Sequence, residues 1–215
     1  MLSFVEEIIL LLLDDAKGAL VDMPLSAFNV VVSGAALMDL AIRNRIDTDL
    51  EKAVVTDPTP TGDDILDDAL GRLREAGDGL TVAECVDRIA AAADDYKERA
   101  LERLVAHGIL REENGRFLWV FHTRRYPVID DREQREVKAR LRQILLSDEI
   151  PDPRDVVLIC LVDACRLFGL VLTAAEIETA DARIAQLRKL DLIGQAVGAA
   201  VWDIQSSIAL AATAG

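Results

Sequence analysis

Residues 3–13 read Ser-Phe-Val-Glu-Glu-Ile-Ile-Leu-Leu-Leu-Leu, and this stretch decides the fold. Ser3 followed three residues later by Glu6 is the pattern of a capping box, which begins a helix. The helix from Phe4 to Leu13 is apolar nearly all round, whereas a surface helix carries an apolar stripe on one side only. We therefore expect a central core helix that other helices surround.

Further helices are predicted along the rest of the chain. Apolar periodicity indicates a second buried helix over 26–43, in which Gly34 lets a neighbour approach closely. An acidic segment rich in turn residues follows, and then a short helix from Asp63 to about Ala76. Two more capping boxes begin helices, Thr81 with Glu84 and Thr173 with Glu176. The helix that begins at Thr81 is expected to cover 81–107 with a kink near Asp94, and the one that begins at Thr173 to cover 173–190. Further helices are expected over 131–146 and 153–168 and in a tail from 193.

One strong strand signal lies between these helices. Ile109-Leu110 and the aromatic run 116–121 are separated by Asn114-Gly115, and Asn-Gly between two apolar runs favours a β-hairpin with its turn there. The expected fold class is mainly α, with one projecting β-hairpin. We expect a single helical domain over 1–192 and an apolar helix over 193–215 that packs on the domain or serves association.

Composition limits the class of protein. The chain has 215 residues, of which 51% are apolar and 4% aromatic, and a net charge of −14. A chain of this length buries about 70% of its unfolded surface and needs no disulfide or metal to fold. No lysine or arginine precedes the first apolar run, and no uncharged stretch of about 18 apolar residues exists. We therefore expect a cytoplasmic protein, peripheral at the inner face of a membrane if it binds one, with Cys85, Cys160 and Cys165 as thiols.

Basic residues gather in one part of this acidic chain. The segment from Lys97 to Arg142 carries twelve basic and eight acidic residues, a net charge of +4, which leaves −18 for the remainder. We name these twelve residues the basic island: Lys97, Arg99, Arg103, Arg111, Arg116, Arg124, Arg125, Arg132, Arg135, Lys138, Arg140 and Arg142. Intrahelical ion pairs on a solvated face are the other interpretation of the same charges.

Motifs for catalysis are weak. The chain has no Gly-x-Ser-x-Gly sequence, and its two histidines, His107 and His122, are too isolated for a metal site. The run 63–68, Asp-Asp-Ile-Leu-Asp-Asp, could hold magnesium against a diphosphate, but acids at a helix N-terminus are also favoured by the helix dipole. We expect no catalytic residue, no metal and no cofactor, with a magnesium-dependent diphosphate enzyme as an alternative.

A second alternative is DNA binding. A helix, then Gly-Ile-Leu and then a hairpin resembles a winged helix, whose recognition helix would enter a DNA groove. Against this interpretation stand Glu98 and Glu102 on that helix, Glu112-Glu113 before the hairpin's turn, and the negative net charge. We therefore expect no nucleic acid partner.

Five segments in the same order resemble the Golgi phosphoprotein 3 family. They are Leu-Ser-Phe-Val-Glu-Glu-Ile-Ile-Leu-Leu-Leu-Leu at 2–13, Gly-Ala-Ala-Leu-Met-Asp-Leu-Ala-Ile-Arg-Asn-Arg-Ile at 34–46, Pro-Thr-Gly-Asp at 60–63 with Leu-Asp-Asp-Ala-Leu at 66–70, Glu-Arg-Leu-Val-Ala-His-Gly-Ile-Leu at 102–110, and the hairpin that ends in Tyr126-Pro127. The resemblance covers about residues 2–190. The richness in Ala, Asp and Arg is typical of a divergent bacterial member.

The resemblance implies a mostly helical domain with a projecting hairpin and no catalysis. It also implies a peripheral membrane adaptor, since eukaryotic members bind phosphatidylinositol 4-phosphate and the cytosolic tails of Golgi glycosyltransferases. The four positions that match their head-group pocket hold Pro24, Ser33, Asp94 and Lys97, so only one positive charge is kept.

These observations together give our expectations for the site. Candidate lipid-binding or phosphate-binding residues are Lys97, Arg99, Arg111, Arg116, Arg124 and Arg125. We expect Trp119 and Phe121 to contact the membrane or a partner. The expected partners are anionic membrane lipid or a protein, and a second copy through the hairpin or the C-terminal helix.

Overall fold

The helix at the centre of the fold is α1 (Phe4–Leu12), seen in a computed structural model. The structure describes residues 2–14, 18–21, 23–48, 52–117, 121–164, 166–190, 195 and 199, without the side chains of 114–117 and 121–124. The capping box predicted for α1 is present: the Ser3 N–H donates to Glu6 Oε2 at 2.7 Å, and the Glu6 N–H donates to Ser3 Oγ at 3.2 Å. All nine residues of α1 are buried, as expected for a core helix.

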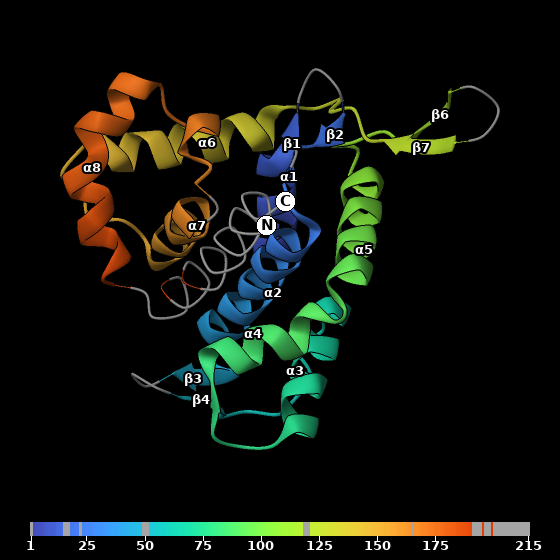
Figure 1. The fold of residues 1–215 in the computed structure, drawn as a ribbon, viewed down its shortest axis with the longest axis vertical. Helices are drawn as coiled ribbons and strands as arrows, with labels where there is room; N and C mark the ends of the chain where they lie inside the picture. Colours follow the sequence, from blue (N-terminus) through green and yellow to red (C-terminus); the bar gives the residue numbers. More distant parts are fainter. Residues whose placement is uncertain are drawn as a thin grey trace, which may run out of the picture.

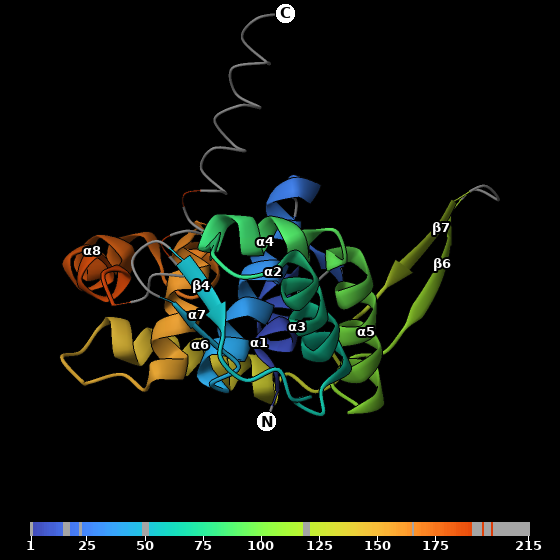
Figure 2. The same cartoon turned by 90° about the horizontal axis from the view of Figure 1, so that it is seen from below.

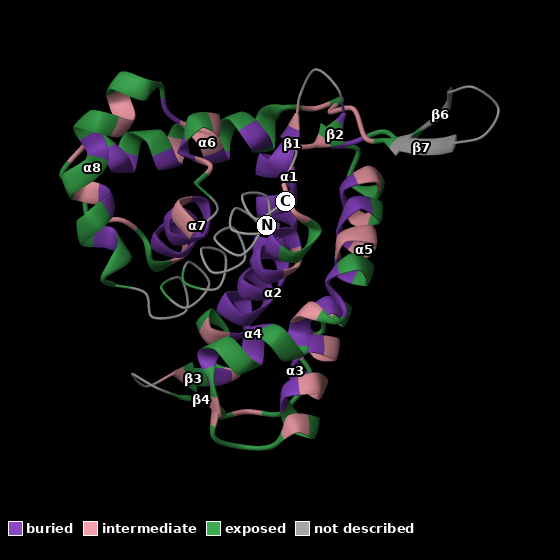
Figure 3. Ribbon diagram, in the orientation of Figure 1, coloured by how far each residue is buried: buried purple, intermediate pink, exposed green. Residues whose placement is uncertain are grey.

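A second core helix, α2 (Leu25–Ile42), packs against α1. The backbone N–H of Phe4 donates to Asp39 Oδ2 at 2.9 Å, so a buried carboxylate of α2 holds the start of α1. Both helices are buried over most of their length (Figure 3). By length and composition α2 could cross a membrane, but 72% of it is buried inside the protein, which is typical of a core helix.

In the described part of the chain, six more α-helices surround this pair, and they lie on two sides of it (Figure 1). On one side lie α3 (Asp64–Ala76), α4 (Val82–Ala90) and α5 (Ala93–Ala106). On the other side lie α6 (Arg132–Leu145), α7 (Pro153–Ala164) and α8 (Ala174–Arg188), with a short 3-10 helix at Phe168–Leu170. The capping boxes predicted at Thr81 and Thr173 are both present. The predicted mainly α class is confirmed.

The single kinked helix predicted over 81–107 is instead two helices. α4 ends at Ala90 and α5 begins at Ala93, because Ala92 leaves the helical conformation with φ −109° and ψ 3°. The change of direction lets each helix bury its own apolar face, and Tyr96 on α5 is fully buried. The predicted end of α5 is confirmed: His107 is its C-cap, and Gly108 follows with φ +73°.

Short strands join some of the helices, and the sequence did not predict them. The antiparallel pair β1 (Leu13–Asp14) and β2 (Ala19–Leu20) follows α1. A small antiparallel sheet of β3 (Ile46–Thr48), β4 (Lys52–Val55) and β5 (Leu80–Thr81) lies beside α4. Strands of two to four residues are too short to show an alternating apolar pattern.

The predicted β-hairpin is confirmed, but its predicted turn is wrong. β6 (Glu113–Phe117) pairs with β7 (Phe121–Arg125), so Asn114-Gly115 lies inside a strand and the connection is 118–120. The same register continues toward the body through the bridge between Leu110 and Val128. Leu110 is buried and Val128 is packed against the core, so burial at this end outweighs the local preference of Asn-Gly for a turn.

Some expectations fall on residues outside the described ranges. They are those for Trp119, for Cys165 and for most of the predicted helix over 193–215, in which the structure describes Gln195 and Ala199 alone. The other two cysteines, Cys85 and Cys160, are buried as expected. The division into a domain over 1–192 and a C-terminal helix stays a prediction.

Candidate functional site

The site begins with the stem of the hairpin, where the chain leaves and re-enters the helical body. The Tyr126 N–H donates to the Gly18 carbonyl at 2.7 Å, which ties the end of β7 to the turn between β1 and β2. Gly18 has φ +59°, and a Cβ there would lie 2.7 Å from the backbone nitrogen of Pro127. Only glycine lets the two backbone segments come this close. Their contact fixes where the hairpin projects from the helical body (Figures 1 and 2).

A shallow pocket of about 210 Å³ lies against this stem. Leu13, Gly18, Ala19, Leu20, Lys97, Glu98, Leu101 and Tyr126 line it. Lys97 Nζ lies 2.8 Å from Asp94 Oδ1, 3.9 Å from Glu98 Oε1 and 5.8 Å from the centre of the Phe28 ring. Among the described residues that line this pocket, Lys97 is the cation, and carboxylates of its own helix, α5, hold it.

Four positions match the family's head-group pocket. Two of them belong to α2 or its start and two to α5, and these two helices contact each other. Pro24 is the N-cap of α2, and Asp94 is in the first turn of α5. Ser33 is fully buried, and its hydroxyl donates to the Asn29 carbonyl at 2.7 Å. Lys97 alone supplies a positive charge, so these positions cannot form the paired guanidinium clamp that binds a phosphate bidentately.

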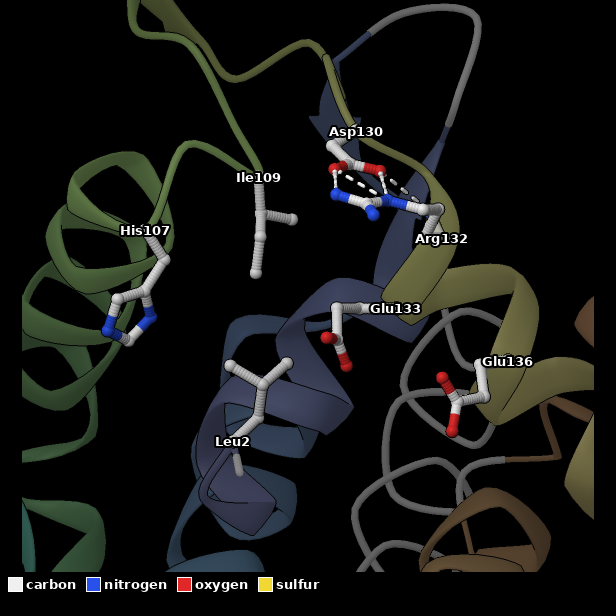
Figure 4. A pocket seen from close by; sticks show the side chains of 7 residues that line it. All are labelled: Leu2, His107, Ile109, Asp130, Arg132, Glu133 and Glu136. Carbon is white, nitrogen blue, oxygen red and sulfur yellow. Dashed lines mark hydrogen bonds and ion pairs between the residues drawn. The ribbon is translucent and has the colours of Figure 1, made fainter.

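A larger pocket of about 420 Å³ is lined by residues of the segments that lead into and out of the hairpin (Figure 4). His107 at the end of α5 and Glu133 and Glu136 on α6 line opposite sides of it (Figure 4). Asp130 and Arg132 also line it, joined at 2.9 Å, and the Arg132 guanidinium lowers the pKa of Asp130 to about 2. Among the described lining residues, three carboxylates against one guanidinium favour a cationic group here over a phosphate. The sequence analysis missed this pocket, because its residues come from three separate segments.

Several arginines of the basic island are paired with acidic residues, some of them neighbours in the sequence and others from distant segments. Arg99 contacts Asp95 at 2.6 Å and Asp64 at 3.2 Å, and Arg111 contacts Glu113 at 2.5 Å. The same holds for other members: Arg103 pairs with Asp63, Arg140 with Asp155 and Arg142 with Glu176. These pairs reduce the positive field that the sequence alone indicates for the helices of the island.

The remaining candidate residues belong to the hairpin. Arg125 is exposed at the end of β7. The backbone places Arg116 opposite His122 and Arg124 opposite Asn114, so positions 116 and 124 share one face of the ladder and 121 and 125 share the other. The structure therefore brings Arg116, Arg124, Arg125 and Phe121 together on one projecting element, apart from Lys97 and Arg99 on α5.

The acidic run 63–68 serves the local fold. Asp63 caps α3 by accepting from the Ile65 N–H at 3.0 Å. Burial raises the pKa of Asp63, but Arg103 at 2.9 Å outweighs burial and holds it below its usual range. Asp68 accepts from the Tyr96 hydroxyl and from Arg72, each at 2.7 Å, and Asp67 accepts from Thr61. Within the described part of the chain, no three acidic, histidine or cysteine side chains are arranged to hold a metal ion.

These features define a class of protein: a mainly α-helical scaffold with one projecting β-hairpin and surface pockets near the base of the hairpin. The chain belongs to the Golgi phosphoprotein 3 family, because the family described as Golgi phosphoprotein 3 (GPP34) matches residues 4–204. It is similar to vacuolar protein sorting-associated protein 74 of Eremothecium gossypii, with 24% identity over 224 residues that cover 88% of this chain and 67% of the relative. The resemblance inferred from the sequence is confirmed, and members of this family act as adaptors with lipid and protein partners.

Proposed function

We propose that this protein is a non-catalytic adaptor that docks on anionic membranes through its hairpin. The observation that carries the proposal is the projecting strand pair β6–β7, which sets three arginines and an aromatic residue off the helical body (Figure 2). Such an element can reach a membrane while the acidic body stays away from it. Membership of a family of peripheral adaptors supports the same function.

The lipid selectivity that we propose differs from that of the eukaryotic relatives. Phosphoinositide recognition needs several cations that converge on one phosphate. The matching positions hold Pro24, Ser33, Asp94 and Lys97, and Lys97 is paired with Asp94. We therefore propose attraction to negatively charged lipid in general, with little response to the inositol 4-phosphate and with strong weakening by salt.

An adaptor also needs a surface for a protein partner. The acidic pocket beside the stem, lined by Asp130, Glu133 and Glu136, suits a basic segment of such a partner (Figure 4). In this arrangement the membrane would contact the hairpin, and the partner would bind next to the base of the hairpin. The location that follows is the cytosolic surface of a membrane.

Vesicle co-sedimentation at low and at physiological salt tests the proposal. We expect binding to vesicles that contain phosphatidylserine, no binding to neutral phosphatidylcholine, and no gain when phosphatidylinositol 4-phosphate replaces phosphatidylserine at equal charge. Arg124→Glu with Arg125→Glu should weaken binding at least about tenfold, since each basic residue near an anionic surface contributes about 1 kcal/mol.

The matched control is Arg74→Glu with Arg88→Glu, which makes the same charge change on exposed residues of α3 and α4. It should leave binding nearly unchanged if the hairpin is the docking element. Selective binding to phosphatidylinositol 4-phosphate that resists salt would refute the proposed lipid selectivity. Binding to no vesicle at all would refute membrane docking and leave a protein partner as the ligand.

A further inference from the structure

An apolar groove lies where the end of α2, the start of α7 and the end of α8 come together. It has a volume of about 370 Å³, and its lining includes Ile42, Ile150, Pro151, Pro153, Val157 and Leu190. Three of these side chains are large and well exposed: Ile150 is 96% exposed, Leu190 65% and Ile42 40%. Apolar side chains gathered in one hollow of the surface are typical of an interaction site.

The chain itself leads directly from this groove into its last segment. Leu190 lines the groove and ends the continuous described part of the chain, so residue 191 starts at its edge. The segment that follows carries an apolar stripe with spacings of four, four, three and four, which is a helical pattern. The stripe consists of Ile193, Val197, Val201, Ile204 and Ile208.

The structure describes two residues of this segment, and their positions can be compared with the apolar stripe. Gln195 and Ala199 are both helical and both exposed. At about 100° per residue, the direction midway between them is opposite to the centre of the apolar stripe. The two described residues therefore lie on the face opposite the stripe, which is the face that should meet solvent if the stripe packs on another apolar surface.

We propose that the C-terminal helix of the same chain docks in this groove and covers Ile42, Ile150 and Leu190 with its apolar stripe. The occupant is the chain's own segment, because only residues 191 and 192 separate Leu190 from the first residue of the stripe. Such a short connection gives the segment an effective concentration that a second molecule cannot match in dilute solution. A helix over 193–208 is about 24 Å long and carries the whole stripe.

Hydrogen exchange of the tail amides in the full chain tests this proposal. Ile150→Asp changes the groove, and Val201→Asp changes the stripe. Each should speed exchange over 193–208 at least about tenfold, because a carboxylate would lie in the apolar contact that protects the helix. The double variant should exchange no faster than the faster single variant, since both substitutions break the same contact.

Two controls separate docking from general destabilisation. Ile129→Asp introduces the same charge at a residue that is 55% exposed outside the groove, and Ala199→Asp introduces it on the exposed face of the tail helix. Neither should change exchange over 193–208. Leu190→Asp provides a second groove variant, and circular dichroism verifies that each variant keeps its helical body.

Several outcomes would overturn the proposal. Tail amides that exchange at the unprotected rate in the unmodified protein would show that the segment does not dock. Protection that is insensitive to both Ile150→Asp and Leu190→Asp would place the tail on another surface. Protection that rises with protein concentration, together with a dimer mass in light scattering, would assign the groove to a second copy of the chain. None of these measurements uses lipid, so the result is independent of the proposed membrane function.

Discussion

At the scale of single residues, Gly18 decides how the hairpin is attached. Its positive φ lets the turn after β1 approach the backbone of Pro127, and its carbonyl accepts the Tyr126 N–H at 2.7 Å. A side chain at this position meets backbone atoms, which cannot move aside as the end of a flexible side chain can. The hairpin's direction therefore depends on the absence of a Cβ at one residue.

Gly18→Ala should destabilise the protein by about 2 kcal/mol, because alanine disfavours positive φ and its Cβ would collide with Pro127. Gly71→Ala is the matched control, since Gly71 lies inside α3 with no atom within 4 Å of the added Cβ. That control should gain about 0.5–1 kcal/mol from helix propensity. Urea unfolding measures both, and equal stability of the two variants would contradict the role assigned to Gly18.

Residue by residue, the candidate site was only partly predictable from the sequence. The charges themselves are visible, but their partners are not: Arg103 meets Asp63, 40 residues earlier in the chain, and Arg99 meets Asp64, 35 residues earlier. Local spacing indicates only intrahelical pairs such as Arg99 with Asp95. The depletion of the basic island by distant acids could be seen only once α3 and α5 were placed together.

At the scale of elements, a buried charge cluster links three helices. Arg154 at the start of α7 donates to Glu7 of α1 at 2.9 Å and lies 4.1 Å from the centre of the Phe4 ring. Arg140 of α6 donates to Asp155 at 2.6 Å and lies 3.7 Å from Glu7. Of the two buried carboxylates of α1, Glu6 caps the helix itself, whereas Glu7 is neutralised by arginines of the two helices that cover it.

Arg154→Ala should cost about 3 kcal/mol, because it leaves the Glu7 carboxylate buried without its hydrogen bond. Burial already raises the pKa of Glu7 above its usual value, and removal of the arginine should raise it further. A carboxyl with a raised folded pKa binds a proton on folding, so the lost stability should be regained as pH falls through that pKa.

Urea unfolding at neutral and at acidic pH measures this effect. Arg132→Ala is the control, since the Arg132–Asp130 pair is exposed and its loss should change stability little. A deficit in Arg154→Ala that stays constant with pH would mean that Glu7 is not its source. Glu7→Gln with Arg154→Ala should remove the pH dependence.

Elements were predictable to the extent that their signals are local. The three capping boxes and the apolar periodicity of α1 and α2 place helices correctly, because a cap and a helical face involve residues a few positions apart. The hairpin's register was not predictable in this way. Asn114-Gly115 is a strong local turn signal, yet the pairing of Leu110 with Val128 at the buried end sets the register.

At the scale of the whole molecule, the protein divides into an acidic helical body and a hairpin that stands off it (Figure 2). The body contains the hydrophobic core, to which every helix contributes, and β6 and β7 pair mainly with each other. The element proposed to reach the membrane is therefore separate from the contacts that stabilise the fold. Stability and docking can be changed independently.

Replacement of 113–125 by a short Gly-Ser linker tests this separation. The free energy of unfolding should change by less than about 0.5 kcal/mol, as is usual for changes away from the core. The same variant should lose its binding to anionic vesicles, because it lacks the arginines of β6 and β7. Strong destabilisation in urea would show that the hairpin is part of the folding unit, and unchanged vesicle binding would assign docking to the body.

The complete burial of α1 has a consequence for the order of events on the ribosome. This apolar helix is made early, but its cover is made late: Gln134 of α6 donates to the Leu10 carbonyl at 2.9 Å, and Arg154 of α7 holds Glu7. Helices α6 and α7 must therefore leave the exit tunnel before α1 can be enclosed. Until then α1 is an uncovered apolar segment, and chaperones that bind emerging apolar chain should be in strong demand during that interval.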